Sequence, residues 1–127
     1  MRPSGASVGR LGEEQAARYL IGLGHSIVAR NWRSSHLELD IVSIKGRELH
    51  IVEVKSRTVP AELPPEAGLS AAKKRRMVAA AKAFLNSAER MRLPSDLDVH
   101  FDAITVLVDG QDFEIEYYPQ VFIPIYA

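Results

Sequence analysis

The chain has 127 residues, 46% of them hydrophobic and 25% charged, which is typical of a soluble globular protein and predicts one domain spanning residues 1–127. The net charge is zero and cysteine is absent, which excludes a generally basic nucleic-acid-binding surface, disulfides and thiol nucleophiles. No segment has the roughly 20 apolar residues of a membrane span, and the N-terminus lacks a signal-peptide core, so we expect a cytoplasmic protein with no membrane partner.

Apolar residues at helical spacing predict a first helix over Val8–Leu23, ended by Gly24. Its expected buried stripe consists of Ala16, Tyr19, Leu20 and Leu23. At about 100° per residue, Glu13 falls on the edge of that stripe, whereas Glu14 points to the far side. The two neighbouring glutamates are therefore not equivalent, and Glu13 is the candidate for a functional role.

Three strands are expected next. Their predicted ranges are Ser26–Trp32, Leu37–Ile44 and Glu48–Ser56. In the second of them apolar and acidic residues alternate, and Gly46 separates it from the third, which is rich in branched side chains. These two strands are predicted to form a hairpin.

The second half of the chain begins with an irregular, mobile loop, expected over Thr58–Gly68 because it contains three prolines. Ser70 is a candidate N-cap for a helix that runs to about Ala88. Its expected buried residues are Met77, Val78, Ala81, Phe84, Leu85 and Ala88. The last expected elements are a strand over Val99–Val108, a turn at Asp109-Gly110, a strand over Phe113–Tyr118 and a tail, Val121–Tyr126, packed on the sheet.

The register of the first hairpin carries the functional argument. A two-residue turn at Gly46-Arg47, with glycine first as a type II′ turn prefers, pairs Lys45 with Glu48. Counting back, Asp40 then faces Glu53 and Glu38 faces Lys55, all on one side of the sheet. A turn at Lys45-Gly46 is the alternative, and it would place Asp40 opposite Ile51.

Two directly opposed carboxylates destabilise a sheet unless a positive charge lies between them. A divalent cation such as Mg²⁺ or Mn²⁺ would supply that charge, since hard cations prefer oxygen ligands. Lys55 is placed to orient an attacking water or to stabilise the transition state. The sequence therefore predicts a metal-dependent catalytic site at Asp40, Glu53 and Lys55. For Glu38 a contact with Lys55, a plain ion pair and a further ligand all remain open.

This order of motifs resembles the PD-(D/E)XK nuclease superfamily and, more closely, the YraN-like family of uncharacterised bacterial proteins, itself considered similar to archaeal Holliday-junction resolvases. The resemblance rests on Gly12-Glu13, Asn31-Trp32-Arg33, Glu38-Leu39-Asp40-Ile41, Val52-Glu53-Val54-Lys55-Ser56-Arg57, Lys73 and Phe101-Asp102. It implies an α/β fold with a restriction-endonuclease-like αβββαβ core, in which helices flank a mixed central sheet. It also implies a metal site that includes Asp40, Glu53, Val54 and Glu13, with Lys55 in the catalytic position.

The expected activity is hydrolysis of phosphodiester bonds in DNA, with branched DNA as one candidate substrate, and the alternative is a non-catalytic nucleic-acid-binding module. Lysines and arginines near the start of the second helix oppose its macrodipole, and a bound phosphate would remove that conflict. The candidate backbone contacts are Arg57, Lys73, Lys74 and Arg76. Related resolvases work as dimers, so a homodimer is also open.

Two further interpretations concern polar residues outside this set. Asp102 is expected to be a buried hydrogen-bonding acid rather than a metal ligand. The four histidines, His25, His36, His50 and His100, lack metal-ligand spacing and are interpreted as incidental.

Overall fold

The computed structural model describes residues 5–59 and 69–124. Its elements are α1 (Gly5–Gly22), β1 (Ser26–Ser34), β2 (Leu37–Lys45), β3 (Glu48–Thr58), α2 (Ala71–Leu85), the 3-10 helix η1 (Ala88–Arg92), β4 (Asp98–Asp109) and β5 (Asp112–Phe122). The predicted order of elements is confirmed. Most of the expected loop over Thr58–Gly68 lies outside the described residues, and β3 itself continues through Thr58.

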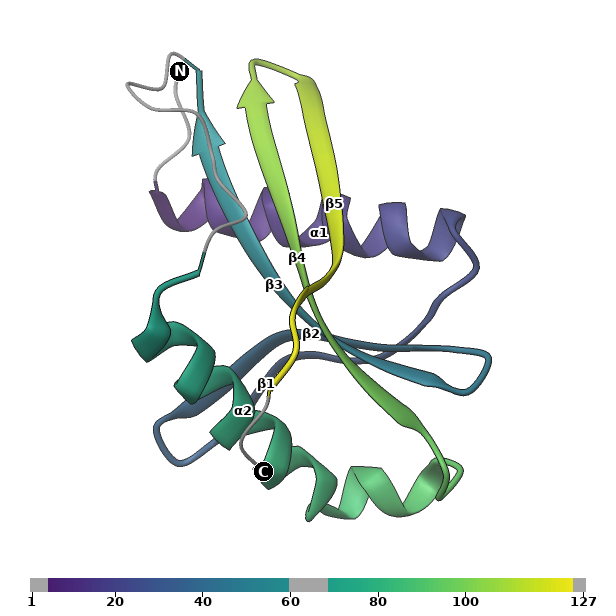
Figure 1. Cartoon of the computed structure of the whole chain (residues 1–127). Coiled ribbons are helices and arrows are strands. Elements are labelled where there is room, and N and C mark those ends of the chain that lie inside the picture. Colours follow the sequence, from purple (N-terminus) through teal and green to yellow (C-terminus); the bar gives the residue numbers. More distant parts are fainter. Residues whose placement is uncertain (1–4, 60–68, 125–127) are drawn as a thin grey trace.

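The strands form one sheet in the order β1-β2-β3-β4-β5. All neighbouring strands are antiparallel except β3 and β4, which are parallel and have α2 and η1 between them in the chain. The sheet is strongly twisted, so that the β1–β2 hairpin crosses the direction of β4 and β5 in Figure 1. This is a mixed α/β sheet flanked by two helices, as a restriction-endonuclease-like core requires.

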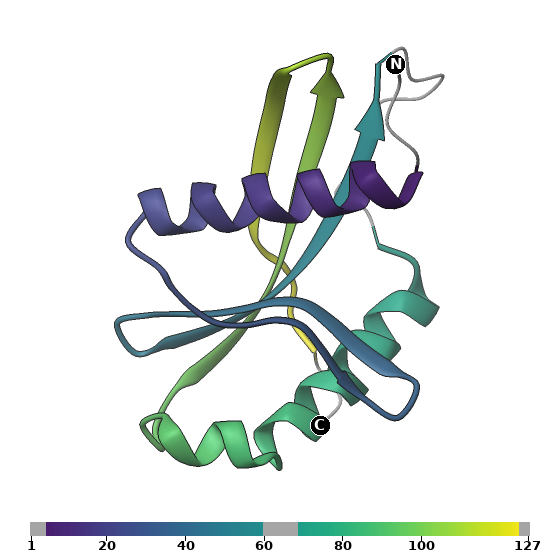
Figure 2. The ribbon, with the colours of Figure 1, turned by 180° about the vertical axis from the view of Figure 1, so that it is seen from behind.

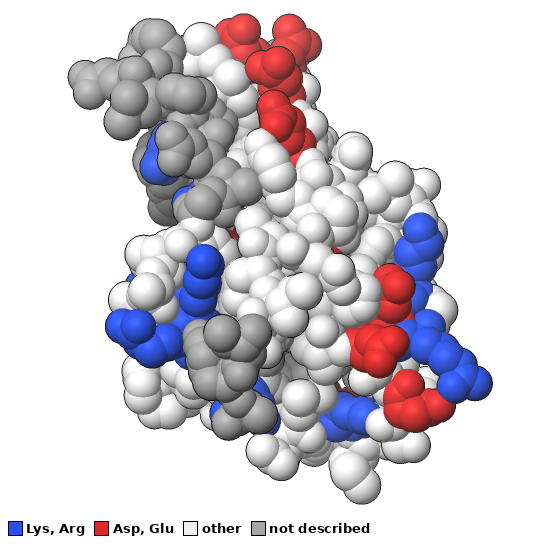
Figure 3. Space-filling model, viewed as in Figure 1, with Lys and Arg blue, Asp and Glu red and all other residues white. Residues whose placement is uncertain are grey.

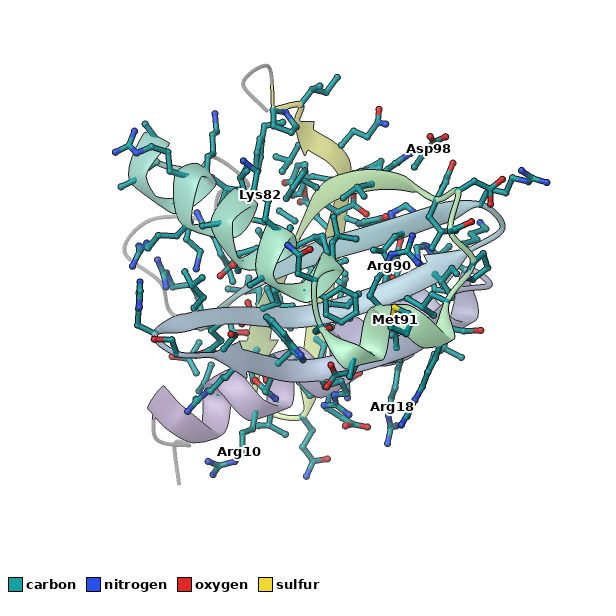
Figure 4. All side chains as sticks on the ribbon, turned by 90° about the horizontal axis from the view of Figure 1, so that it is seen from below. Arg10, Arg18, Lys82, Arg90, Met91 and Asp98 are labelled. Carbon is teal, nitrogen blue, oxygen red and sulfur yellow. The ribbon has the colours of Figure 1, made fainter. Side chains whose placement is uncertain are left out.

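The two helices cover opposite faces of the sheet. Figure 2 shows α1 crossing in front of β3 and β4. In Figure 4, α2, with Lys82, lies on one side of β1 and β2, and α1, with Arg10 and Arg18, lies on the other. Each helix has its own core. On the α1 side Leu20 packs with Ile41 and Val52, and on the α2 side Phe84 packs with Leu49 and Ile51. Successive residues of β3 therefore face different helices.

Helix α1 packs closely on β3 at Gly12, which has no side chain. A Cβ atom added at Gly12 would overlap the hydroxyl oxygen of Ser56 and come within 2.9 Å of its Cβ. The close approach holds the following residue, Glu13, near the sheet. Of the expected stripe, Ala16 and Leu20 are fully buried, but Tyr19 and Leu23 are 37% and 40% exposed because the helix end extends beyond the sheet. Among the described residues, no helix combines the length and apolar character needed to cross a membrane.

Helix α2 begins where the sequence predicts. The Ser70 hydroxyl accepts a hydrogen bond from the backbone N–H of Lys73 at 3.1 Å, which makes Ser70 the N-cap. The predicted end at Ala88 is wrong, since the helix stops at Leu85 and Asn86 caps it. The Ser87 hydroxyl donates to the carbonyl of Phe84 at 2.6 Å. This bond satisfies a terminal carbonyl of the helix, and the chain restarts as η1 with Ala88 exposed rather than buried.

The second hairpin follows the predicted turn with a shift of one residue. Asp109 pairs with Asp112, so the turn residues are Gly110, at a φ of +62°, and Gln111. β5 is longer than expected and takes in Val121 and Phe122 of the predicted tail. Phe122 stacks on Phe101, with ring centroids 4.9 Å apart, so this part of the tail does pack on the sheet.

Candidate metal centre

The first hairpin has the register that places two acids together. Lys45 pairs with Glu48, and Gly46 adopts a φ of +60°, so the turn is Gly46-Arg47 as predicted. The pairing continues to Ile41 and Val52 and then stops. Just beyond that point, the Asp40 carboxylate accepts a hydrogen bond from the backbone N–H of Val54 at 2.9 Å. This bond fixes one acid against the strand that carries the other.

The Glu53 carboxyl is 14% exposed and lies beside Asp40. Burial disfavours its charge, the negative charge of Asp40 adds to that effect, and together they raise the pKa of Glu53 to about 7 despite the nearby Lys73. The Lys73 ammonium nitrogen is 3.0 Å from Glu53 Oε1. A carboxyl that is half-protonated near neutral pH is a common property of functional sites.

Glu13 approaches the same acids from the α1 side. Burial raises the pKa of its carboxyl, and the charges of Asp40 and Glu38 raise it further, while a hydrogen bond with Asn31 opposes them. The neighbouring Glu14 differs as predicted, because it pairs with Arg18 and Arg30 at the surface. The charge of Asp40 on β2 therefore raises the pKa of both Glu13 on α1 and Glu53 on β3.

A pocket of about 310 Å³ opens over Asp40 and Glu53. Its lining residues are His36, Leu37, Glu38, Asp40, Glu53, Val54, Lys73, Arg76 and Met77. Among the described residues, the lining includes neither Glu13 nor Lys55. Lys55 is half-buried and, two residues after Glu53 in the same strand, shares its face of the sheet. Glu38 forms an ion pair with Arg33 at 3.4 Å, one of the three roles that the sequence left open.

The predicted basic residues divide into two groups. Lys73 and Arg76 line the acidic pocket, and Lys73 is an ion-pair partner of Glu53. Lys74 lies 5.7 Å from the ring centroid of Phe122, and Arg57 is exposed near the end of β3. Figure 3 shows basic side chains over the start of α2 and acidic ones over the β4–β5 hairpin, where the exposed acids are Asp109, Asp112, Glu114 and Glu116. A zero net charge thus includes one locally basic region and one locally acidic region on this face.

The donor set of the pocket suits a hard divalent cation. Carboxylate oxygens are the preferred protein ligands of Mg²⁺ and Mn²⁺, and one or two of them are enough when water and substrate oxygens complete the coordination. Asp40 and Glu53 are adjacent, half-buried and in mutual repulsion, which a cation would relieve. The residues present therefore fit such a metal.

A second polar cluster lies at the other end of β3, and the interpretation of the histidines as incidental misses it. His50 is buried, and its Nδ1 lies 2.6 Å from Asp102 Oδ2 while its Nε2 lies 3.0 Å from Glu48 Oε1. Asp102 is fully buried and also accepts hydrogen bonds from the Tyr117 hydroxyl at 2.5 Å and the Gln120 backbone N–H at 2.8 Å. Asp102 is thus the buried hydrogen-bonding acid that the sequence predicts.

The electrostatics of this cluster are those of a buried ion pair. Burial disfavours the charges of both His50 and Asp102, but other interactions together outweigh it. The hydrogen bonds and charges of Asp102 and Glu48 raise the pKa of His50, and hydrogen bonds from His50, Tyr117 and the Gln120 backbone lower that of Asp102. Burial and the adjacent Asp102 also raise the pKa of Tyr117. No spacing in the sequence shows this cluster, because His50 and Asp102 are 52 residues apart and meet only through the pairing of β3 with β4.

The fold and the acidic pocket place the protein among mixed α/β proteins with a restriction-endonuclease-like core. The sequence profile of the family described as "Uncharacterised protein family UPF0102" matches residues 12–106, and the chain belongs to this family, the YraN-like family of the sequence resemblance. A UPF0102 protein of Bacteroides thetaiotaomicron is 39% identical over 117 residues, covering 92% of this chain and 93% of that protein. Similar relatives occur in Phocaeicola vulgatus, at 40% identity over 91% of this chain and 92% of the relative, and Chlorobium limicola, at 36% over 91% and 92%.

Proposed function

We propose that this protein is a divalent-metal-dependent nuclease that hydrolyses phosphodiester bonds of DNA. One observation carries the proposal. The Glu53 carboxyl is held beside that of Asp40 at the mouth of a polar pocket, with a pKa of about 7 that reflects burial and repulsion. A fold under no functional demand gains nothing from two opposed acids at this position.

Asp40 and Glu53 would hold the cation, with Glu13 and the backbone of Val54 as further members of the site. When bound, the Mg²⁺ or Mn²⁺ ion would supply positive charge to a substrate phosphate. The Val54 N–H keeps the Asp40 carboxylate oriented toward β3. Protonation and cation binding compete at Glu53, so cation affinity should rise from about pH 6 to about pH 8.

Lys55 and Lys73 would have different tasks. Lys55 shares the strand face of Glu53 and is assigned to orient the attacking water and to stabilise charge on the phosphate. Lys73 neutralises Glu53 in the absence of a cation and would turn to the substrate backbone when one binds. In the overall reaction a water oxygen adds to phosphorus, one P–O ester bond breaks and the departing oxygen takes up a proton.

The start of α2 is the proposed contact for the DNA backbone. Arg76 and Lys73 line the pocket, and Lys74 and Arg57 would extend the basic surface beyond it. Each phosphate neutralised by one of these cations releases counterions, so binding should weaken steeply as the salt concentration rises. A salt-independent affinity would contradict this assignment. Branched DNA is the substrate structure to test first beside duplex and single strands.

The direct test is cleavage of labelled duplex, single-stranded and four-way DNA by the purified chain with Mg²⁺ or Mn²⁺. We expect Glu53→Gln and Lys55→Ala to abolish cleavage, and Glu114→Gln, an exposed acid on β5, to serve as the matched control. Glu13→Gln should lower the rate, whereas the adjacent Glu14→Gln, which removes only two surface ion pairs, should not. Cleavage that survives both Glu53→Gln and Lys55→Ala would refute the proposed chemistry.

The Lys73–Glu53 ion pair favours a second candidate, a nucleic-acid-binding module that retains the fold without turnover. A lysine 3.0 Å from Glu53 already offsets the charge that a cation would neutralise. Calorimetric titration with Mn²⁺ separates the two candidates. Binding that is lost in Asp40→Asn supports the enzyme, while metal-independent DNA binding without cleavage supports the module. The same preparations, run on a sizing column, test the homodimer.

A further inference from the structure

The pairing of β3 with β4 brings three potential metal ligands together far from the acidic pocket. His50 and His100 are directly paired across the two parallel strands, and Glu48 precedes His50 by two residues on the same face of β3. One ligand atom from each lies within 4.8 Å of the other two. Along β3, His50 is roughly 10 Å and Glu48 roughly 16 Å from Glu53, and alternation puts Glu53 on the opposite face of the sheet.

We propose that Glu48, His50 and His100 form a second metal site, specific for a borderline transition metal such as Zn²⁺. Two imidazole nitrogens and one carboxylate oxygen are a common three-residue ligand set for zinc, which leaves a fourth position for water. In a tetrahedral site with bonds of about 2.0–2.1 Å, ligand atoms are roughly 3.4 Å apart. The present separations need only a modest contraction to reach that value.

The surroundings of His50 support this site independently of the ligand distances. Histidines that bind metals usually donate their other ring N–H to a carboxylate, which fixes the tautomer and the ring orientation. Here the fully buried Asp102 forms a hydrogen bond of 2.6 Å with His50 Nδ1. The other ring nitrogen, Nε2, is therefore directed toward Glu48. Asp102 is itself held by Tyr117 and by the Gln120 backbone. The hydrogen bonds that would orient His50 as a metal ligand are therefore already present.

The proposed site is open to solvent, and two of its three ligands are partly exposed. A hollow of about 360 Å³ borders all three ligands, with His25, Lys45 and Gln120 also in its lining. The Glu48 side chain is 44% exposed and already within 3.0 Å of His50 Nε2. His100 is half-buried and within 3.2 Å of the Gln120 side-chain nitrogen, a contact that a metal would replace. Zinc bound here would join the starts of β3 and β4, so its main effect would be on stability.

The test begins with full-length protein freed of metal by a chelator and then titrated with Zn²⁺ in a calorimeter. We expect one equivalent to bind at this site and to raise the melting temperature. Loss of an orienting partner alone typically weakens metal binding 10- to 100-fold, so loss of a ligand in His100→Ala or Glu48→Gln should weaken zinc binding at least about 100-fold. Both side chains are partly exposed, and the metal-free variants should melt close to the wild type.

Two control variants keep this proposal distinct from the nuclease proposal. His36→Ala removes a histidine that lines the acidic pocket, and Asp40→Asn removes an acid there, so zinc binding at the second site should survive both. In a crystal soaked with Zn²⁺, anomalous scattering at the zinc edge should place the ion among Glu48, His50 and His100. Absence of zinc binding, or binding that is lost in Asp40→Asn and kept in His100→Ala, would overturn the second site and leave the nuclease proposal standing.

Discussion

The two ends of β3 differ in how their charges are balanced. At the Glu53 end, burial and the charge of Asp40 raise the pKa values of Glu13 and Glu53. At the His50 end, Asp102 has a lowered pKa because His50, Tyr117 and the Gln120 backbone all donate to it. The direction of the pKa shift of the acid distinguishes the two ends. A lowered pKa, as at Asp102, marks a network that stabilises the charge, and a raised pKa, as at Glu53, marks surroundings that disfavour it.

The difference extends to the metals that each end suits. The acidic end offers carboxylate oxygens beside a pocket lined by cations, which fits a hard ion and a phosphate. The histidine end offers two imidazoles and one carboxylate, which fits zinc. The predictions below test whether these two ends are as independent as this division implies, and they run from the largest expected effect to the smallest.

The strongest test is the loss of cleavage in Asp40→Asn. This change removes a proposed ligand and the acceptor for the Val54 N–H, so we expect the cleavage rate to fall by about 10³-fold or more. Zinc binding by the same variant should be unchanged, because the histidine end lies on the other face of the sheet. Parallel assays of Mn²⁺-dependent cleavage and of zinc affinity measure both effects. Loss of both properties together would show that the two ends are coupled.

Asp102→Asn should produce a large loss of stability. The carboxylate is fully buried and accepts from three donors, and an amide in its place turns an N–H group toward at least one of them. Breaking a buried charged network of this kind costs about 3–5 kcal/mol. Urea unfolding monitored by circular dichroism measures it. Asp112→Asn, an exposed acid in the β4–β5 hairpin, is the control, and an equally small effect of both changes would contradict the stabilising role of Asp102.

Glu53→Gln, unlike Asp102→Asn, should increase the stability of the fold at high pH. The pKa of Glu53 is about 7 in the fold against an ordinary 4.5, so above pH 4.5 the unfolded chain loses a proton that the folded chain retains. Wild-type stability contributed by this group should therefore be full below about pH 4.5 and fall until about pH 7, by about 3 kcal/mol in total.

The glutamine variant cannot ionise, so it should lack that decline and be more stable than the wild type at pH 8, while losing cleavage. Thermal unfolding without added metal, at pH 5 and pH 8, measures the difference. A variant less stable than the wild type at pH 8 would show that the Lys73–Glu53 ion pair outweighs the repulsion from Asp40.

Gly12→Ala should lower the stability of the fold by a smaller amount, because it disturbs the packing of α1 on β3 next to Glu13. The new Cβ would collide with Ser56, and overpacking of this kind costs about 1–3 kcal/mol. Gly9→Ala is the matched control in the same helix, because no atom lies within 4 Å of its added Cβ, and it should stabilise the protein by about 0.5–1 kcal/mol. Opposite signs in chemical unfolding are the expected result. Equal effects would exclude the contact with Ser56 as the cause.

Much of the acidic end could be predicted because local rules determine it. The Gly46-Arg47 turn sets the register of β2 and β3, and that register brings Asp40 to Glu53. Helical periodicity separates Glu13 from Glu14, and Ser70 marks the start of α2. Predictions failed at helix ends. Tyr19 and Leu23, near the end of α1, are exposed rather than buried, and the Ser87 hydroxyl and Asn86 end α2 before Ala88.

The sequence alone determined the order of elements, the α/β class and the pairing of the first two acids, since each depends on local patterns in the chain. It also determined the family, from short motifs that recur in order along the chain. Only the tertiary structure decided that Lys73 meets Glu53 and that His50 meets His100 and Asp102. No tight turn sets the register of the parallel pair β3–β4, whose connection includes a whole helix packed on the opposite face from α1. The register depends on how that helix packs, and the histidine cluster exists only once it has packed.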